Sequence, residues 1–161
     1  MDKIVYQTIG VIRSPHRNPA EIPAQPVFAK DIAGQVELNL ELIPGLDGLS
    51  GFSHIYLFYH FHGSQGSRLR FKPYLAEEEF GIFATRAPHR PNALGMSVVR
   101  LHKIEENILH VLDVDILDGT PLLDIKPFVQ RFDARKEVCS GWQDAVSDEL
   151  AAHRGLRDYR K

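Results

Sequence analysis

Alternating hydrophobic and polar positions predict a chain built mainly of short β-strands. In residues 34–42, GQVELNLEL, aliphatic side chains fall on one face and mostly polar ones on the other, as in a half-buried strand. Residues 54–61, HIYLFYHF, are apolar or aromatic on both faces, which predicts a strand covered on both sides. Two further runs, joined by the sequence EEN, predict a hairpin. The predicted strands are residues 5–12, 34–42, 54–61, 80–85, 96–104 and 108–117.

Helical spacing occurs near the C-terminus alone. Trp142, Val146 and Leu150 recur there at intervals of four, and Ser140 stands where a helix can be capped. Many short strands and one terminal helix predict a mainly all-β fold, an antiparallel β-barrel of about six or more short strands with a C-terminal α-helix. We expect residues 1–138 to form the barrel domain and residues 139–161 to form the helix and a basic tail.

Length, net charge and cysteine content restrict the class of protein and the compartment that we expect. The chain has 161 residues, enough for one domain with a substantial core. Its net charge of −2 provides no global attraction for nucleic acid, so any polyanion site must be local. Cys139 is the one cysteine, the N-terminal sequence lacks the features of a secretory signal, and no apolar run approaches about 20 residues. We therefore expect a cytoplasmic protein without a membrane span.

The sequence GIFATRAPHRPNALG, residues 81–95, is the first candidate for chemistry. Pro88 and Pro91 exclude both a helix interior and a central strand, so this is a stiff loop. Arg86 and Arg90 offer guanidinium groups suited to a carboxylate or phosphate, and His89 can relay a proton. The alternative is a solvated turn whose arginines pair with the surface acids Glu77, Glu78 and Glu79.

Two other loops are candidates. Residues 14–26, SPHRNPAEIPAQP, hold four prolines, and we expect an ordered flap that lies beside the 86–92 loop if the flanking strands pair. Residues 117–121, LDGTP, contain Asp118, which can bond nearby backbone, and Gly119, which permits a left-handed turn. This segment is interpreted as a turn that ends a strand, with a loop that grips a ribose or an amine as the alternative.

Three further features receive structural interpretations. His60 and His62 share one face of a strand, and a packed or edge pair is favoured over a metal site because no cysteine cluster or HExxH motif accompanies them. Asp113 and Asp115 likewise share a strand face, which is interpreted as solvated rather than as a catalytic pair. The basic C-terminal sequence, HRGLRDYRK, is interpreted as a frayed tail, with RNA contact as the alternative.

Together these loops resemble a known family. The sequences IGVIRSPH, PAQP, FSHIYLFYHFH, GIFATRAPHRPNALGMSVVRL and DVDILDGTPLLDIKPF are similar to those of the TsaA-like, or TrmO, family over approximately residues 5–132. The resemblance implies an S-adenosylmethionine-dependent tRNA methyltransferase on a β-barrel. It implies homodimers with the cofactor near the subunit interface. The implied reaction is N6-methylation of N6-threonylcarbamoyladenosine beside the anticodon of a threonine tRNA.

The resemblance also implies site residues. The cofactor site would contain Pro23, Ala24, Gln25, His62, Gly63, Arg86, Leu101, Leu117, Asp118, Gly119, Thr120 and Pro121. His62 and Asp118 are the candidates for proton removal, and no metal is expected. Family members known for tRNA activity carry a further C-terminal domain, so we expect RNA binding here to depend on the dimer, the tail and a basic set. That set is Arg68, Arg70, Lys72 and Arg90, with Asn92 beside it.

Two alternatives to this function stay open. A methyltransferase on the same barrel could act on a different acceptor. The chain could also be a non-catalytic module that binds an adenosyl ligand or RNA, although its net charge of −2 disfavours a pure RNA binder.

Overall fold

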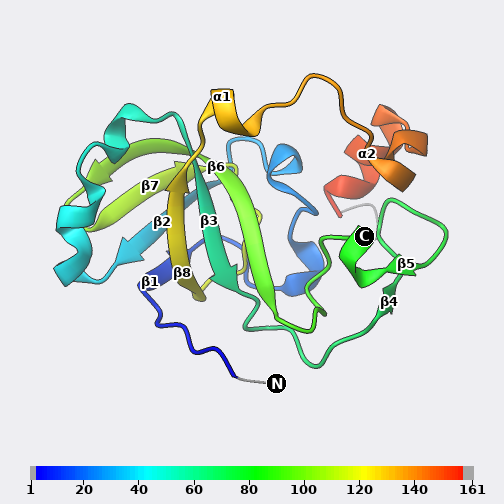
Figure 1. Ribbon diagram of the computed structural model, residues 1–161, viewed down its shortest axis with the longest axis horizontal. Helices are drawn as coiled ribbons and strands as arrows, with labels where there is room; N and C mark the ends of the chain where they lie inside the picture. Colours follow the sequence, from blue (N-terminus) through cyan, green and yellow to red (C-terminus); the bar gives the residue numbers. More distant parts are fainter. Residues whose placement is uncertain (1–2, 158–161) are drawn as a thin grey trace.

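The structure is a computed structural model that describes residues 3–157, and its main element is a closed antiparallel β-barrel. Around the barrel the strands are β1 (Gly10–Arg13), β2 (Ala33–Leu38), β7 (Ile108–Leu112), β6 (Leu94–Glu105), β3 (His54–His60) and β8 (Thr120–Pro127), and β8 closes on β1. The barrel fills one half of the molecule in Figure 1, and the other half is rich in loops. The predicted fold class is confirmed.

Alternate side chains of the strands fill the barrel interior. Val36 and Leu38 of β2 are buried, as the alternation in the sequence predicts, and they meet Leu57 of β3 in the same core. Each such aliphatic side chain contributes roughly 1.5–3 kcal/mol when it is fully buried. Tyr56 and Phe58, on the outer face of β3, are only half-buried, with ring centroids 6.1 Å apart. Within this single chain the outer face of β3 is therefore covered only in part.

Several strands are shorter than their patterns predict. β1 begins at Gly10 rather than at residue 5, and Gly10 pairs with Leu38, the last residue of β2. Beyond this pair the chain turns into a 3₁₀ helix, Leu40–Leu46, so the continued alternation there belongs to no strand. β7 ends at Leu112 because Asp113 has a φ of 70°, which no strand accommodates. Strand length thus depends on where a partner ends, which the local pattern does not record.

The hairpin between β6 and β7 is confirmed. Glu105 pairs with Ile108, and Glu106 between them has a φ of 53°, as a tight turn requires. β8, in contrast, was not expected as a strand. Prolines stand at positions 121 and 127, near its two ends, where they cost few ladder hydrogen bonds, but they hide the strand pattern in the sequence.

Short elements make up the part outside the barrel. β4 (Arg70–Phe71) pairs with β5 (Phe80–Gly81), so residues 80–85 form a two-residue strand followed by a 3₁₀ helix rather than one longer strand. The helices are α1 (Gln130–Asp133) and α2 (Asp148–Gly155). The 3₁₀ helices are Pro19–Glu21, Pro26–Phe28, Leu40–Leu46, Leu49–Gly51, Ile82–Ala84 and Gly141–Ala145.

The predicted terminal helix is broken in two. Residues 141–145 form a 3₁₀ helix, and α2 begins after Ser147, whose hydroxyl accepts a hydrogen bond from the Leu150 amide at 3.2 Å. Ser147 rather than Ser140 is therefore the α-helical cap. The break lets the Trp142 ring stack on Phe80, with centroids 5.0 Å apart. Within residues 3–157 no helix is long and apolar enough to cross a membrane. The division of the chain at residue 138 stays a prediction.

Candidate functional site

A large cavity lies where β3 ends and where β6 and β8 begin. Its volume is about 1900 Å³, more than the roughly 300–1000 Å³ of a typical small-molecule pocket, so a cofactor and part of a larger substrate can fit together. Separate parts of the chain line it, namely residues 22–28, 61–64, 85–92 and 115–117, together with Thr120. The cavity thus brings together segments up to about a hundred residues apart in the sequence.

The 86–92 loop is held rigid by its own side chains. One guanidinium nitrogen of Arg90, Nη1, donates to the carbonyl oxygens of Ile82 at 3.1 Å and Thr85 at 2.8 Å. The His89 ring forms a 3.1 Å hydrogen bond with Ser64 Oγ, which ties the loop to the segment after β3. These contacts replace the pairing with Glu77, Glu78 and Glu79 that the solvated-turn alternative requires. Arg90 is therefore partly committed to loop structure.

Arg86 joins the two loops predicted to lie side by side. Its Nη1 donates to Gln25 Oε1 at 2.7 Å, across 61 positions of sequence, which confirms the predicted contact. The flap is held from its other side by α2, because the Ala24 amide donates to the Gly155 carbonyl at 2.7 Å. Pro23, Ala24 and Gln25 all line the cavity, as does Arg86. The side chain of Arg86 is exposed, so its charge is available to a ligand.

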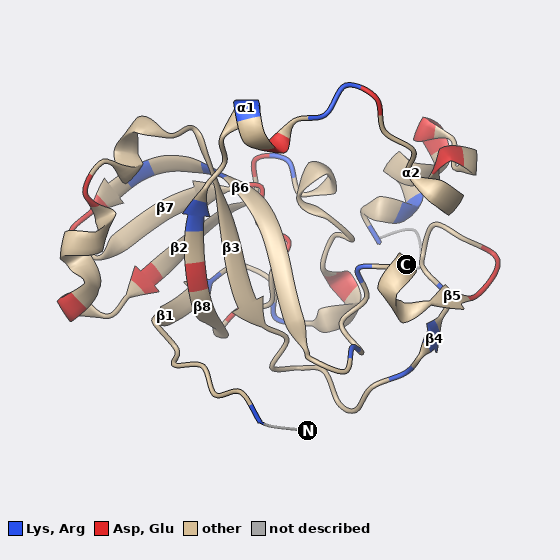
Figure 2. Cartoon of the chain, viewed as in Figure 1, with Lys and Arg blue, Asp and Glu red and all other residues tan. Residues whose placement is uncertain are grey.

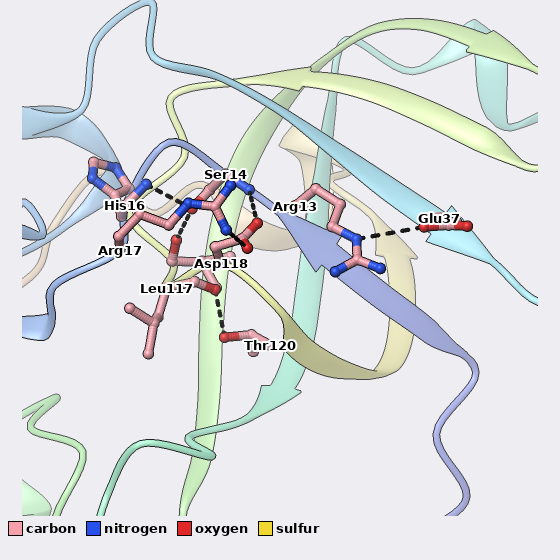
Figure 3. A network of polar contacts seen from close by, with 9 residues as sticks. Arg13, Ser14, His16, Arg17, Glu37, Leu117, Asp118 and Thr120 are labelled. Carbon is pink, nitrogen blue, oxygen red and sulfur yellow. Dashed lines mark hydrogen bonds and ion pairs between the residues drawn. The ribbon is translucent and has the colours of Figure 1, made fainter.

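The turn at 117–121 anchors the beginning of the flap. Asp118 Oδ1 accepts from the Ser14 amide at 3.0 Å, and Oδ2 forms an ion pair with Arg17 (Figure 3). Gly119 has a φ of 76°, the left-handed turn that the sequence predicts. Of the predicted turn residues, Leu117 and Thr120 line the cavity, whereas Asp118, Gly119 and Pro121 lie outside its lining. The Asp118 carboxylate thus holds the beginning of the flap, and its role in proton removal stays a prediction.

His62 and Gly63 lie at the barrel end of the cavity. His62 Nδ1 is 3.2 Å from Thr120 Oγ1, and a Cβ on Gly63 would lie 3.3 Å from Leu117 Cδ2. This contact places Gly63 directly beside the 117–121 turn. His62 is exposed, and among residues 3–157 no cluster of three or more potential metal ligands occurs.

Leu101 stands apart from the other residues that the resemblance implies. It lies on β6 opposite Val111, packs against the barrel core, and its amide donates to the Ser53 carbonyl at 2.9 Å. It does not line the cavity of this single chain.

Asp113 and Asp115 do not share a solvated strand face. Both follow the end of β7, and Asp113 has a positive φ, so the alternation of a strand no longer places them. Asp113 pairs with Arg100, with 2.6 Å between Oδ2 and Nε. Asp115 has a different partner and accepts a 2.6 Å hydrogen bond from Ser97, while both aspartates line the cavity. The interpretation of Asp115 as a solvated side chain is wrong, because alternation predicts a face only while the strand continues.

The basic residues outside the cavity are held loosely. Arg70 and Lys72 pair with Glu79 and Glu77 at 3.5 and 3.2 Å, with all four side chains more than half exposed. Such surface pairs contribute about 0–1 kcal/mol each, so phosphates can displace the glutamates. In Figure 2 the Lys and Arg positions at and beside β4 lie next to the Asp and Glu positions of the loop near β5. Arg68 is exposed nearby, and Asn92 lines the cavity.

The C-terminal tail lies partly outside the described residues, since residues 158–161 are not described. Up to that point it is not frayed. Arg154 Nη2 pairs with Glu77 at 2.6 Å, and the Arg157 guanidinium lies 4.1 Å from the centre of the Tyr74 ring. The sequence interpretation missed this packing because the contacts join α2 to residues about 80 positions away.

Aromatic walls of the cavity were also missed. Phe28, Phe61, Phe71, Phe83 and Trp142 all line it. Trp142 Nε1 donates to the Ala84 carbonyl at 2.8 Å, which fixes the C-terminal segment beside the 86–92 loop. Nothing in the local sequence distinguishes these rings from ordinary core residues, and only the fold shows them around one space.

Proteins with known names and a solved structure resemble this chain in sequence and in fold. A Pyrococcus abyssi protein named "Probable S-adenosyl-L-methionine-binding protein" is 54% identical over 139 residues, which cover 86% of this chain and 76% of that protein. The Escherichia coli tRNA (adenine(37)-N6)-methyltransferase is 32% identical over 94% of this chain and 69% of its own length. The crystal structure of TrmO from Pseudomonas aeruginosa superimposes with a TM-score of 0.77 at 38% identity.

The matches cover most of this chain but only part of the longer relatives. The match to the Pseudomonas structure covers 91% of this chain but 65% of that one. The family model for the tRNA-methyltransferase O N-terminal domain matches residues 11–134, which include every strand of the barrel except the first residue of β1. The chain therefore belongs to the tRNA-methyltransferase O family, in which this barrel is the N-terminal domain.

Proposed function

We propose that the chain is an S-adenosylmethionine-dependent methyltransferase that methylates N6 of adenosine 37, beside the anticodon of tRNA. The observation that carries this proposal is that parts of the separate family motifs line one large cavity. The family membership and the E. coli relative, a tRNA (adenine(37)-N6)-methyltransferase, support it. The finer acceptor that we propose is N6-threonylcarbamoyladenosine of a threonine tRNA.

The cavity suits the chemical groups of the cofactor. A methionine carboxylate needs a cationic donor, and Arg86 offers an exposed guanidinium that is already aligned by Gln25. An adenine ring needs apolar walls, and the aromatic lining provides them. We propose that Pro23, Ala24 and Gln25 hold the cofactor from the flap, and that Gly63, Leu117 and Thr120 hold it from the barrel end. When bound, the cofactor supplies a methyl group already activated by its sulfonium.

Alignment is the main task of the protein in such a transfer. Holding two reactants in line can contribute on the order of 7–11 kcal/mol. The rigid 86–92 loop and the flap tied to α2 are suited to this, because backbone hydrogen bonds fix both sides of the cavity. The volume beyond one cofactor leaves room for the base of a single-stranded anticodon loop, which leaves its stack at low cost.

We propose that Arg68, Arg70, Lys72 and Arg90 bind the tRNA backbone, with Asn92 beside the base. Arg70 and Lys72 would exchange their exposed glutamate partners for phosphates. Affinity for tRNA should then fall steeply as salt rises. Because the net charge is −2, this local set, rather than the overall charge, would guide the nucleic acid.

We further propose that the chain acts as a homodimer in the cytoplasm. Leu94 and Met96 on the outer face of β6 are 48% and 41% exposed and line the cavity, and Tyr56 and Phe58 of the adjacent β3 share that face. Exposed apolar side chains at the edge of a site are typical of surfaces that a partner covers. A second copy here would place the cofactor near the subunit interface.

Thermal unfolding in the presence of S-adenosylmethionine tests the cofactor assignment. Ligand at about a hundred times its dissociation constant adds roughly 2.7 kcal/mol, which for a chain of this size raises the midpoint by roughly 5–10 °C. Arg86→Ala should abolish the rise. Arg13→Ala, which removes an exposed arginine paired with Glu37 on the barrel wall, should retain it.

The acceptor is tested next with labelled cofactor. Transfer to threonylcarbamoylated tRNA, with no transfer to unmodified tRNA, is the expected result. Transfer to another acceptor alone would contradict the substrate assignment. A thermal shift without any transfer would favour a binding module instead.

A further inference from the structure

Asp115 places a carboxyl group at the barrel end of the cavity. It follows β7, lies next to Ile116 and Leu117 in the lining, and is partly buried. Ser97 Oγ on β6 donates to Asp115 Oδ1 at 2.6 Å. Ser97 is itself 2% exposed and forms a 3.0 Å hydrogen bond with the hydroxyl of Tyr59 on β3. Three side chains from different elements thus form one chain of hydrogen bonds beside the apolar core of the barrel.

The direction of the hydrogen bonds in this chain follows from donor counting. A serine hydroxyl has one proton, and that of Ser97 goes to Asp115. The Tyr59 hydroxyl must therefore donate to Ser97. Burial, together with the charge of Asp115, raises the pKa of Tyr59, so the phenol keeps its proton. Because Oδ1 of Asp115 is committed as an acceptor, Oδ2 is the atom left to take up or release a proton.

The backbone is adapted to this arrangement. A Cβ on Gly95 would lie 2.2 Å from Tyr59 Cε2, so only glycine lets the tyrosine ring lie across β6 and reach Ser97. A barrel that merely needed filling would place apolar side chains at these positions, since burying polar groups costs free energy unless all are hydrogen-bonded. The chain from Tyr59 to Asp115 is therefore better explained by a task for the carboxyl group than by packing.

The surroundings of Asp115 also suit proton uptake near neutral pH. Burial raises the pKa of its carboxyl group to about 7, against the opposing effects of the Ser97 hydrogen bond and the charge of Arg86. The titratable and charged groups that interact with it are Tyr59 of β3 and Arg86 of the 86–92 loop. A base works best when its pKa lies near the working pH, which an ordinary aspartate does not satisfy.

We propose that Asp115 is the catalytic base of this site and takes the proton from the acceptor nitrogen during methyl transfer. The inference rests on the proposed function. As the nitrogen bonds to the methyl carbon, the carbon–sulfur bond of the cofactor breaks and the sulfur keeps the electron pair. The N6 hydrogen leaves as a proton and is bound by Asp115 Oδ2. Ser97 and Tyr59 are positioning residues that act through Asp115.

The first test measures Asp115 directly, without turnover. Carbon NMR of the labelled carboxyl groups, with Asp115→Asn to assign the signal, should show titration near pH 7. Ser97→Ala removes a hydrogen bond to the charged form and should move the midpoint to higher pH. Titration near the ordinary value of about 3.9 would overturn the proposal whatever the activity.

The second test separates catalysis from cofactor binding. Asp115→Asn should bind S-adenosylhomocysteine within about threefold of the wild type while single-turnover methylation falls about 100-fold or more, as for loss of a general base. The acidic limb of the wild-type pH profile should disappear as well. Asp124→Asn, a surface control paired with Lys126, should keep the wild-type profile.

Three other results would contradict either the role of Asp115 or the proposed function. Loss of S-adenosylhomocysteine binding in Asp115→Asn, with an unchanged rate at saturation, would mean that the carboxylate holds the cofactor, and the proposal would be wrong. Near wild-type methylation by the variant would also refute it. Absence of transfer by the wild-type chain would contradict the proposed function, whereas the NMR titration decides the state of Asp115 separately.

Discussion

Replacing Asp115 with asparagine should change how the stability of the protein depends on pH. Asparagine has nearly the same shape, and its Oδ1 can still accept the hydrogen bond from Ser97. The substitution therefore removes the titration while keeping the contact. A comparison of the two proteins across pH isolates the contribution of this one group.

The magnitude follows from the pKa of the folded protein. A rise from the ordinary value of 3.8 to about 7 corresponds to about 4 kcal/mol at neutral pH. Because Asp115 holds its proton more tightly in the folded protein than in the unfolded chain, its contribution is fully present below about pH 4. It is lost as the pH rises towards 7 and is constant above that. At neutral pH the aspartate thus destabilises the wild type relative to Asp115→Asn. For a chain of this size the thermal unfolding midpoint of the wild type should be lower by roughly 10 °C.

Urea denaturation at a series of pH values from 4.5 to 8 measures this effect. The free energy of unfolding of Asp115→Asn, minus that of the wild type, should increase over this range by up to about 4 kcal/mol and then level off. Groups such as Glu77 and Glu105, whose pKa values are lowered by their ion pairs, affect both proteins equally and cancel. A difference that stays constant within about 0.5 kcal/mol from pH 4.5 to 8 would refute the reasoning.

Two glycine substitutions test the packing around the cavity. Gly95→Ala should lower the free energy of unfolding by about 1–3 kcal/mol in urea denaturation, because its Cβ would lie 2.2 Å from the Tyr59 ring. Gly155→Ala would bring a Cβ within 2.4 Å of the Phe28 ring, so the amide bonded to the Gly155 carbonyl should exchange its hydrogen faster. Gly81→Ala, where a Cβ meets nothing within 4 Å, is the control for both and should behave as the wild type.

The candidate site was predictable at segments whose prolines or glycines restrict the backbone conformation. The prolines of the 86–92 loop predict a stiff segment, and the left-handed Gly119 predicts a tight turn. The contact from Arg86 to Gln25 was predictable only as a condition on strand pairing. The roles of the aspartates were not predictable. Asp118 is bonded to Arg17 and Ser14, and Asp115 lines the cavity from the segment after β7, where the strand pattern has ended.

The sequence by itself determined that this is a barrel of short antiparallel strands, because an alternating pattern is a local property that each strand carries. It also determined which loops belong to a known family. Only the tertiary structure decided where strands end, since a strand lasts as long as its partner does. Closure of the barrel decided which polar side chains point into the cavity. Tyr59, Ser97 and Asp115 meet there because β3, β6 and the segment after β7 converge, and no spacing along the chain records that convergence.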